Sequence, residues 1–203
     1  VVLFEADTLP SDNQHIAKLV EPILTNPEVG LVYGNEASAQ PGHFLGKTIK
    51  MQVEIYLKTF NHEFTDWFCT SRSGRAFTRK VYKNLDWPPA VPEDIYMFLW
   101  CKNKNIKTSF QQSVYCFYRP PENFSDLLRA KQKIQSGKKT LRNYFPEHVV
   151  NKFYGISFGH LMGFRLKMKM LFKFFISNPL FFFYYAYLKI KLRLFESAEV
   201  FLF

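Results

Sequence analysis

Hydrophobic and polar positions alternate along the chain in blocks that predict strands and helices in turn. Val1–Phe4 and Val29–Tyr33 are short apolar runs of the kind that form buried strands. Between them, apolar residues recur at spacings of three and four and stop before Pro27, with Ser11 or Asp12 available to cap a helix. The chain therefore begins with a strand, a helix and a second strand.

The same alternation continues to about residue 145. A Pro-rich segment at 87–92 must be an irregular loop, because proline lacks an amide donor and restricts the residue before it. The other predicted elements are a helix at 44–60, an extended segment at 64–70, a strand at 75–78, a helix at 79–85, a helix that opens at Glu93, a strand at 107–118 and a helix at 124–141. This order predicts an α/β fold with a mixed sheet and flanking helices over residues 1–145.

The tail, residues 146–203, has a different character and is rich in Phe, Tyr, Leu and Lys. Leu171–Ile190 is mostly apolar over about the length that spans a bilayer. Lys173 and Asn178-Pro179 interrupt it, and basic residues flank both ends. We therefore expect one or two amphipathic helices lying in a membrane interface, with a kinked span or an ordinary helical cap on the sheet as alternatives.

Charge supports an anionic partner. The chain has 27 Lys and Arg against 17 Asp and Glu, a formal net charge of +10. Much of the positive charge lies at Lys131–Lys139 and Lys167–Arg193, and the second stretch is interleaved with large apolar residues. That interleaving favours a membrane surface as partner, and the sequence has no nucleic-acid-binding signature, so no nucleic acid is expected as partner.

The cysteines are three in number and lack CxxC spacing, which argues against a disulfide framework or a cysteine zinc site. Cys69, Cys101 and Cys116 each sit among aromatic residues and are expected to be small buried hydrophobes. A reducing compartment follows, and we expect a membrane-associated protein at the cytoplasmic face.

The first acidic segment is Glu5-Ala6-Asp7, directly after the first strand. Two carboxylates at the carboxyl end of a buried strand project into the crevice where α/β sheets bind ligands. Such hard oxygen ligands suit Mg²⁺ or Mn²⁺ bridging to a diphosphate. The alternative is a turn or capping feature.

The second acidic segment is Glu93-Asp94, which follows the Pro-rich loop and opens a helix. One of the two carboxylates could act as a general base toward an acceptor hydroxyl. The alternative is that both acids simply stabilise the helix N-terminus.

A basic helix carries the third segment, Lys131–Lys139. On a helix Gln132 and Gln135 share a face, as do Arg129 and Lys133. Amides and cations on one face can bind phosphate oxygens and acceptor hydroxyls. The alternative is a solvated basic face.

Taken in order, these segments resemble the family 2 glycosyltransferases with the GT-A fold, over about residues 1–142. Val1–Pro10 is similar to the family's strand, Asp-x-Asp metal motif and following helix, and Ser73–Lys80 resembles the Ser-Gly segment that lines the donor sugar pocket. Pro92–Ile95 is similar to the family's Glu-Asp motif. Pro121–Gly137 resembles the segment that carries a Gln-x-x-Arg-Trp motif in processive members.

The resemblance implies an inverting transfer from a nucleotide-diphosphate sugar to a hydroxyl acceptor, either a glycan or a lipid-linked one. Asp94 would be the catalytic base, and Asp7 with Glu5 would hold Mn²⁺ or Mg²⁺. The residues implied in donor or acceptor binding are Glu5, Ser73, Gly74, Arg75, Glu93, Gln132, Gln135 and Lys138.

The chain departs from the family pattern in three places. Glu5 stands where the family has Asp, and Gln135-Ser136 stand where Arg-Trp would be, which favours transfer of a single sugar over processive synthesis. The family's nucleotide-reading half would precede Val1, so we expect a fragment that is poorly stable or inactive alone. The competing hypothesis is a non-catalytic α/β protein that binds a membrane surface and uses its carboxylate pairs as caps.

Overall fold

The computed structural model describes residues 1–6, 8–59, 74–89, 91–153 and 164–200. They fall into two compact units, each described by itself below. The sheet unit comprises the described parts of residues 1–39, 62–119 and 133–156, and the helical unit those of residues 40–61, 120–132 and 157–203. Helix α6 (Phe124–Leu141) contributes its first half to the helical unit and its second half to the sheet unit.

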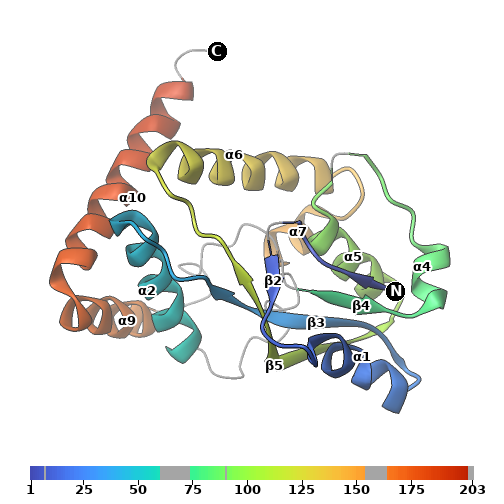
Figure 1. Cartoon of the computed structure of the whole chain (residues 1–203). Coiled ribbons are helices and arrows are strands. Elements are labelled where there is room, and N and C mark those ends of the chain that lie inside the picture. Colours follow the sequence, from blue (N-terminus) through green and yellow to red (C-terminus); the bar gives the residue numbers. More distant parts are fainter. Residues whose placement is uncertain (7, 60–73, 90, 154–163, 201–203) are drawn as a thin grey trace. The chain divides into compact units, whose positions relative to one another are not determined.

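A mixed five-stranded sheet forms the centre of the sheet unit (Figure 1). Its strand order is β1-β4-β3-β5-β2. β3 and β5 run parallel, and every other neighbouring pair is antiparallel. The strands are β1 (Val2–Leu3), β2 (Thr8–Pro10), β3 (Val29–Ser38), β4 (Arg75–Phe77) and β5 (Lys107–Tyr118). The predicted α/β class with a mixed sheet is confirmed.

One strand was not predicted. β2 pairs with the end of β5, where Pro10 lies opposite Cys116. Because β2 forms an edge of the sheet, Pro10 can lack its amide donor there without breaking a bond to a further strand. Its three residues, Thr8-Leu9-Pro10, are too few to show the alternation that marks a strand, and they end in proline.

Helices flank both faces of the sheet. α1 (His15–Thr25) packs on one face and α5 (Glu93–Asn103) on the other. The predicted capping of α1 by Ser11 or Asp12 is wrong, because the helix begins one residue after Gln14, and the Asp12 carboxylate accepts the Gln14 N–H at 2.8 Å. Asp12 therefore forms the turn before the helix. α4 (Arg79–Asn84) and α7 (Glu147–Phe153) complete the helices of this unit in the described residues.

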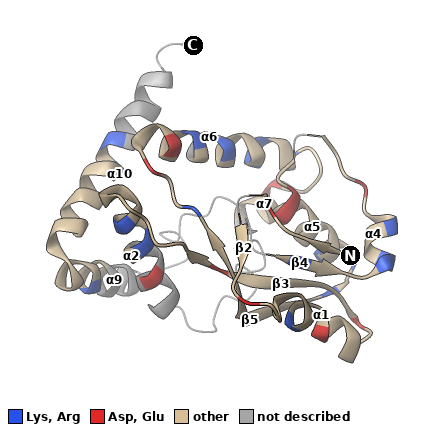
Figure 2. Ribbon diagram, viewed as in Figure 1, with Lys and Arg blue, Asp and Glu red and all other residues tan. Residues whose placement is uncertain are grey.

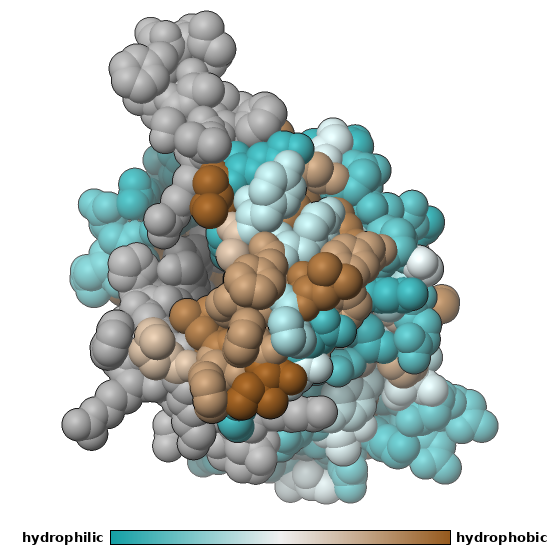
Figure 3. All heavy atoms as spheres, turned by 90° about the vertical axis from the view of Figure 1, so that its left-hand side faces the viewer, coloured by the Kyte–Doolittle hydropathy of each residue, from teal (hydrophilic) through white to brown (hydrophobic). Residues whose placement is uncertain are grey.

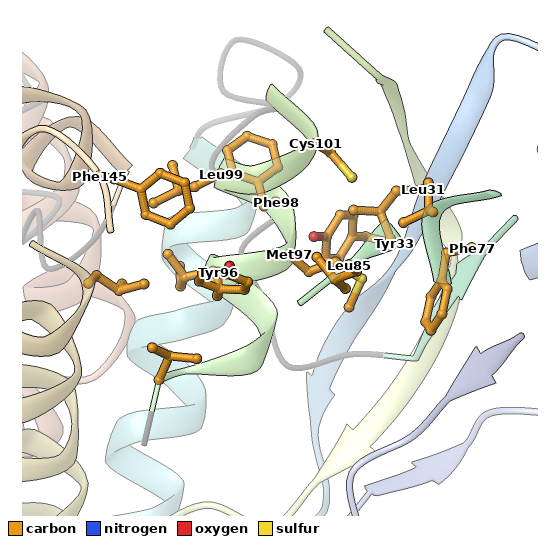
Figure 4. Packing of buried hydrophobic residues seen from close by; sticks show 14 of the residues in the cluster. Leu31, Tyr33, Phe77, Leu85, Tyr96, Met97, Phe98, Leu99, Cys101 and Phe145 are labelled. Atoms are coloured by element: carbon orange, nitrogen blue, oxygen red, sulfur yellow. The ribbon is translucent and has the colours of Figure 1, made fainter. Parts of the chain in front are cut away.

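The larger core lies between α5 and the sheet. Leu31, Tyr33 and Phe77 of the strands share this core with Met97 and Phe98 of α5 (Figure 4). Strand alternation sends the intervening side chains to the opposite face, where a smaller core contains Leu19, Val32, Ala76 and Val114. The side on which each strand residue lies therefore follows from its position in the strand.

The helical unit contains α2 (Phe44–Thr59), α9 (Phe164–Ser177) and α10 (Pro179–Val200). The Phe44 ring lies 4.6 Å from that of Phe181 and 4.9 Å from that of Tyr184, so aromatic edges join α2 to α10. The break predicted at Asn178-Pro179 separates α9 from α10. Within the described residues, no helix combines the length and apolar character needed to cross a membrane.

Candidate functional site

A buried arginine occupies the middle of the α5 face of the sheet. Arg75 of β4 pairs with Leu3 of β1 on one side and with Tyr33 of β3 on the other. Leu3 and Tyr33 both belong to the core beneath α5, so the Arg75 side chain lies on that face as well. Only 3% of the residue is exposed. A cation with so little solvent needs a partner supplied by the protein or by a ligand.

Glu5 provides the charge partner that the structure describes. Its Oε1 lies 3.7 Å from Arg75 Nη2, and 25% of the Glu5 side chain remains exposed. The Nε and Nη1 donors of Arg75 have no hydrogen-bond partner among the described residues. The Arg75 guanidinium therefore pairs with a carboxylate through Nη2, while its Nε and Nη1 hydrogens find no acceptor among the described residues.

Asp94 is held against the same face through Tyr33. The Tyr33 hydroxyl donates to the backbone carbonyl of Asp94 at 3.3 Å, and one carboxylate oxygen of Asp94 accepts the Ile95 N–H at 2.9 Å. Asp94 is partly exposed and Glu93 is exposed, both in the first turn of α5. Their negative charges suit the positive end of the helix.

The structure thus gathers three predicted site residues on one face of one sheet. Glu5 follows β1, Arg75 lies in β4 and Asp94 opens α5, yet Tyr33 adjoins Arg75 and is bonded to Asp94. The sequence predicted these residues separately. Nothing in it showed that Arg75 is buried or that Tyr33 connects the group, because the contacts come from strands far apart in the chain.

Gly74 faces the opposite side of the sheet. A Cβ atom there would lie 2.6 Å from Phe4 Cε1 and 3.1 Å from His15 Nε2, so the close approach of two rings requires glycine. Its N–H donates to Cys116 Sγ at 3.3 Å. The structure gives Gly74 a packing role, and its predicted part in donor binding stays a prediction.

His15 and Cys116 form a second polar pair that the sequence did not indicate. Both are buried, and His15 Nε2 lies 3.5 Å from Cys116 Sγ. Burial lowers the pKa of His15, opposed by the charge of Asp12, and burial also raises the pKa of Cys116. Both shifts favour the neutral forms, so the pair lacks the thiolate that a nucleophilic cysteine needs.

The described residues contain no group of three His, Cys, Asp or Glu side chains that could hold a metal ion. Asp7, the main predicted ligand, lies outside the described residues, as does Ser73. Glu5 offers carboxylate oxygen, the ligand type that Mg²⁺ and Mn²⁺ prefer, and its side chain is partly exposed.

The other predicted site residues lie on α6, along which Figure 2 marks Lys and Arg positions in blue on the ribbon. Gln132 and Gln135 are exposed and Lys138 is partly exposed. Their predicted contacts with donor or acceptor stay a prediction.

Comparison with known proteins adds no family to this picture. No family model matches the chain, and no curated protein matches it. The likeness to glycosyltransferases therefore rests on the motifs of the sequence.

Proposed function

We propose that the chain is the acceptor-side part of a metal-dependent, inverting glycosyltransferase of the GT-A type. The observation that carries the proposal is that the Glu5–Arg75 ion pair lies on the sheet face covered by α5, where the neighbouring Tyr33 bonds the Asp94 backbone. An acid, a cation and a second acid from three separate segments supply the charges that transfer from a sugar diphosphate requires. A set of unrelated helix caps would not need to share a face.

In the proposed reaction Asp94 is the general base. It takes the proton of the acceptor hydroxyl while the hydroxyl oxygen forms a bond to the anomeric carbon. The bond from that carbon to the diphosphate oxygen breaks, and the nucleoside diphosphate leaves with the electron pair. The attack comes from the face opposite the leaving group, so the configuration is inverted in one step.

The metal proposed for this reaction would be held by Asp7 and Glu5. A bound Mn²⁺ or Mg²⁺ supplies Lewis-acid stabilisation of the departing diphosphate. Arg75 keeps the Glu5 carboxylate near the sheet and leaves its exposed side available. The one Asp94 oxygen that accepts the Ile95 N–H fixes the carboxylate at the start of α5.

Replacement of Asp94 tests the assignment. Asp94→Asn removes the base and keeps the shape, so transfer by the full-length gene product should fall about 10²- to 10⁴-fold while nucleotide binding is retained. The measurement is release of nucleoside diphosphate from a panel of nucleotide sugars with glycan and lipid-linked acceptors. Asp86→Asn, at an exposed position of the same unit, is the matched control and should keep parental activity. Parental activity of Asp94→Asn would contradict the proposal.

Calorimetric titration separates the enzyme from the non-catalytic alternative. Nucleoside diphosphates should bind in the presence of Mn²⁺, bind weakly with a chelator, and bind weakly to Glu5→Gln. Equal binding heats with and without metal, for every nucleoside diphosphate tried, would favour the alternative. The acidic residues would then only stabilise a turn and a helix N-terminus.

A further inference from the structure

Helices α9 and α10 each carry two apolar faces. One face packs within the helical unit, where Phe174 and Leu188 are buried. The other is exposed: on α10 it carries Leu180, Phe183 and Tyr187, at spacings of three and four. A helix on the surface of a water-soluble protein normally has one apolar stripe and an opposite polar face. Among the described exposed positions of α9 and α10, Lys173, Ser177 and Lys189 alone depart from an apolar or aromatic character.

The exposed stripes of the two helices adjoin one another. The Phe175 ring of α9 lies 5.5 Å from the Phe182 ring and 5.9 Å from the Phe183 ring of α10. Figure 3 shows apolar surface gathered on one side of the molecule. We call the exposed set the α9–α10 patch; it comprises Met168, Phe172, Phe175, Ile176, Leu180, Phe183, Tyr187 and Ile190.

The patch is well exposed as well as apolar. Ile176 is 63% and Leu180 is 65% exposed, and the eight large apolar side chains of the patch come from two helices that pack against each other. Contiguous apolar surface on this scale marks a binding site in most soluble proteins. The rings are fixed against one another by edge-to-face contacts, so they form a preformed surface.

Charge around the patch indicates what it binds. Lys173 and Lys189 are exposed on the same helices, and Lys191 lies 5.9 Å over the Tyr187 ring. From residue 148 to residue 195 the sequence contains eight Lys and Arg and no Asp or Glu. A second copy of the chain would bring like charges together across such a contact, whereas anionic headgroups would neutralise them.

We propose that the α9–α10 patch docks on the surface of an anionic lipid bilayer. Both helices lie in the plane of the interface, with the patch among the upper acyl chains and the lysine ammonium groups at headgroup level. The inference does not depend on sugar transfer, because it rests on the helical unit alone.

Flotation of the full-length chain with lipid vesicles tests the proposal. The chain should bind phosphatidylcholine vesicles that contain phosphatidylglycerol, and Ile176→Ser/Leu180→Ser should weaken that binding about tenfold or more. The matched control is Ile16→Ser/Leu24→Ser, the same chemistry at two exposed positions of α1 in the sheet unit, which should bind as the parent does. Equal binding by both double variants would overturn the proposal.

A charge series tests the lipid class. Lys173→Gln/Lys189→Gln should weaken binding to the anionic vesicles, as should raised ionic strength, while the exposed pair Lys83→Gln/Lys104→Gln serves as control. Equal binding of the parent chain to pure phosphatidylcholine vesicles and to anionic vesicles would count against the proposal. A second contrary outcome is a dimer of the parent chain, seen by light scattering without lipid, that Ile176→Ser/Leu180→Ser converts to a monomer. The patch would then bind a second copy of the chain.

Discussion

Arg75 is almost fully buried, and the Glu5 carboxylate lies close enough to pair with its charge. Its place on a short strand was predicted from the neighbouring turn and apolar residues. Its burial could not be, because Leu3 and Tyr33, which lie on either side of it, belong to strands that meet β4 only in the folded sheet. A lone arginine in a strand is equally compatible with a solvated edge.

His15 was missed for the same reason. It lies 101 residues from Cys116 in the chain, and no ligand or catalytic spacing draws attention to it. Only folding places the His15 side chain of α1 against Cys116 of β5. Its buried, uncharged state nevertheless has a measurable consequence.

The free energy of unfolding should decrease as pH falls through the usual histidine range. Burial lowers the pKa of His15 below 6.5 in the folded protein, so below pH 6.5 the unfolded chain binds a proton that the folded chain does not. The neutral ring therefore contributes its full share of the free energy of unfolding above pH 6.5. That share decreases as the pH falls from 6.5 to the lowered pKa of the folded protein. The slope from one such group reaches at most about 1.4 kcal/mol per pH unit.

Denaturant unfolding across pH 5 to 7 measures this effect. His15→Phe keeps a ring beside Phe4 and should give a shallower pH dependence than the parent. His148→Gln, at an exposed position, is the control and should keep the parental slope. Parallel curves for His15→Phe and the parent would show that His15 does not cause the dependence.

At the scale of the element, strong local signals placed most helices and strands correctly. Proline, glycine and acidic residues mark the beginnings of α2, α5 and α6, and apolar runs mark β1 and β3. The misses involve weaker signals. β2 takes its strand form from pairing with β5, and Asp12 makes a turn where a cap was predicted.

The break between α9 and α10 depends on one amide side chain. Asn178 Oδ1 accepts the Phe181 N–H at 3.2 Å and Pro179 occupies the first helical position, where its missing donor costs nothing. Asn178→Ala should therefore lower the free energy of unfolding by about 1 kcal/mol. Asn178→Asp keeps an acceptor at the same place and should retain parental stability. Thermal unfolding of the three proteins decides the matter, and equal loss in both variants would mean that the cap contributes little.

At the scale of the whole molecule, the two units are assembled from separate stretches of sequence. A division of the sequence into residues 1–145 and 146–203 can only follow the change in composition. The contacts instead join residues 40–61 to the tail, because α2 supplies Phe44 to α10. Local patterns do not encode that pairing. Charge is also uneven: residues 120–203 hold 14 Lys and Arg against five Asp and Glu, and residues 1–119 hold 13 against 12.

Thiol reactivity reports whether the sheet unit is folded as a whole. Cys101 and Cys116 are free and buried, as predicted, and burial raises the pKa of Cys101 to about 12. Cys69 lies outside the described residues, so the measurement uses Cys69→Ser. Neither remaining thiol should react with dithionitrobenzoate in native buffer, and both should react in denaturant. Rapid reaction in native buffer would show that the unit opens freely.

The bond from the Tyr33 hydroxyl to Asp94 makes the position of a helix end depend on the register of a strand. Shifting β3 by one residue would turn Val32 toward α5 and Tyr33 away from it, since neighbouring strand residues face opposite sides. A single deletion upstream within β3 would thus remove the tether of Asp94 without touching any acidic residue.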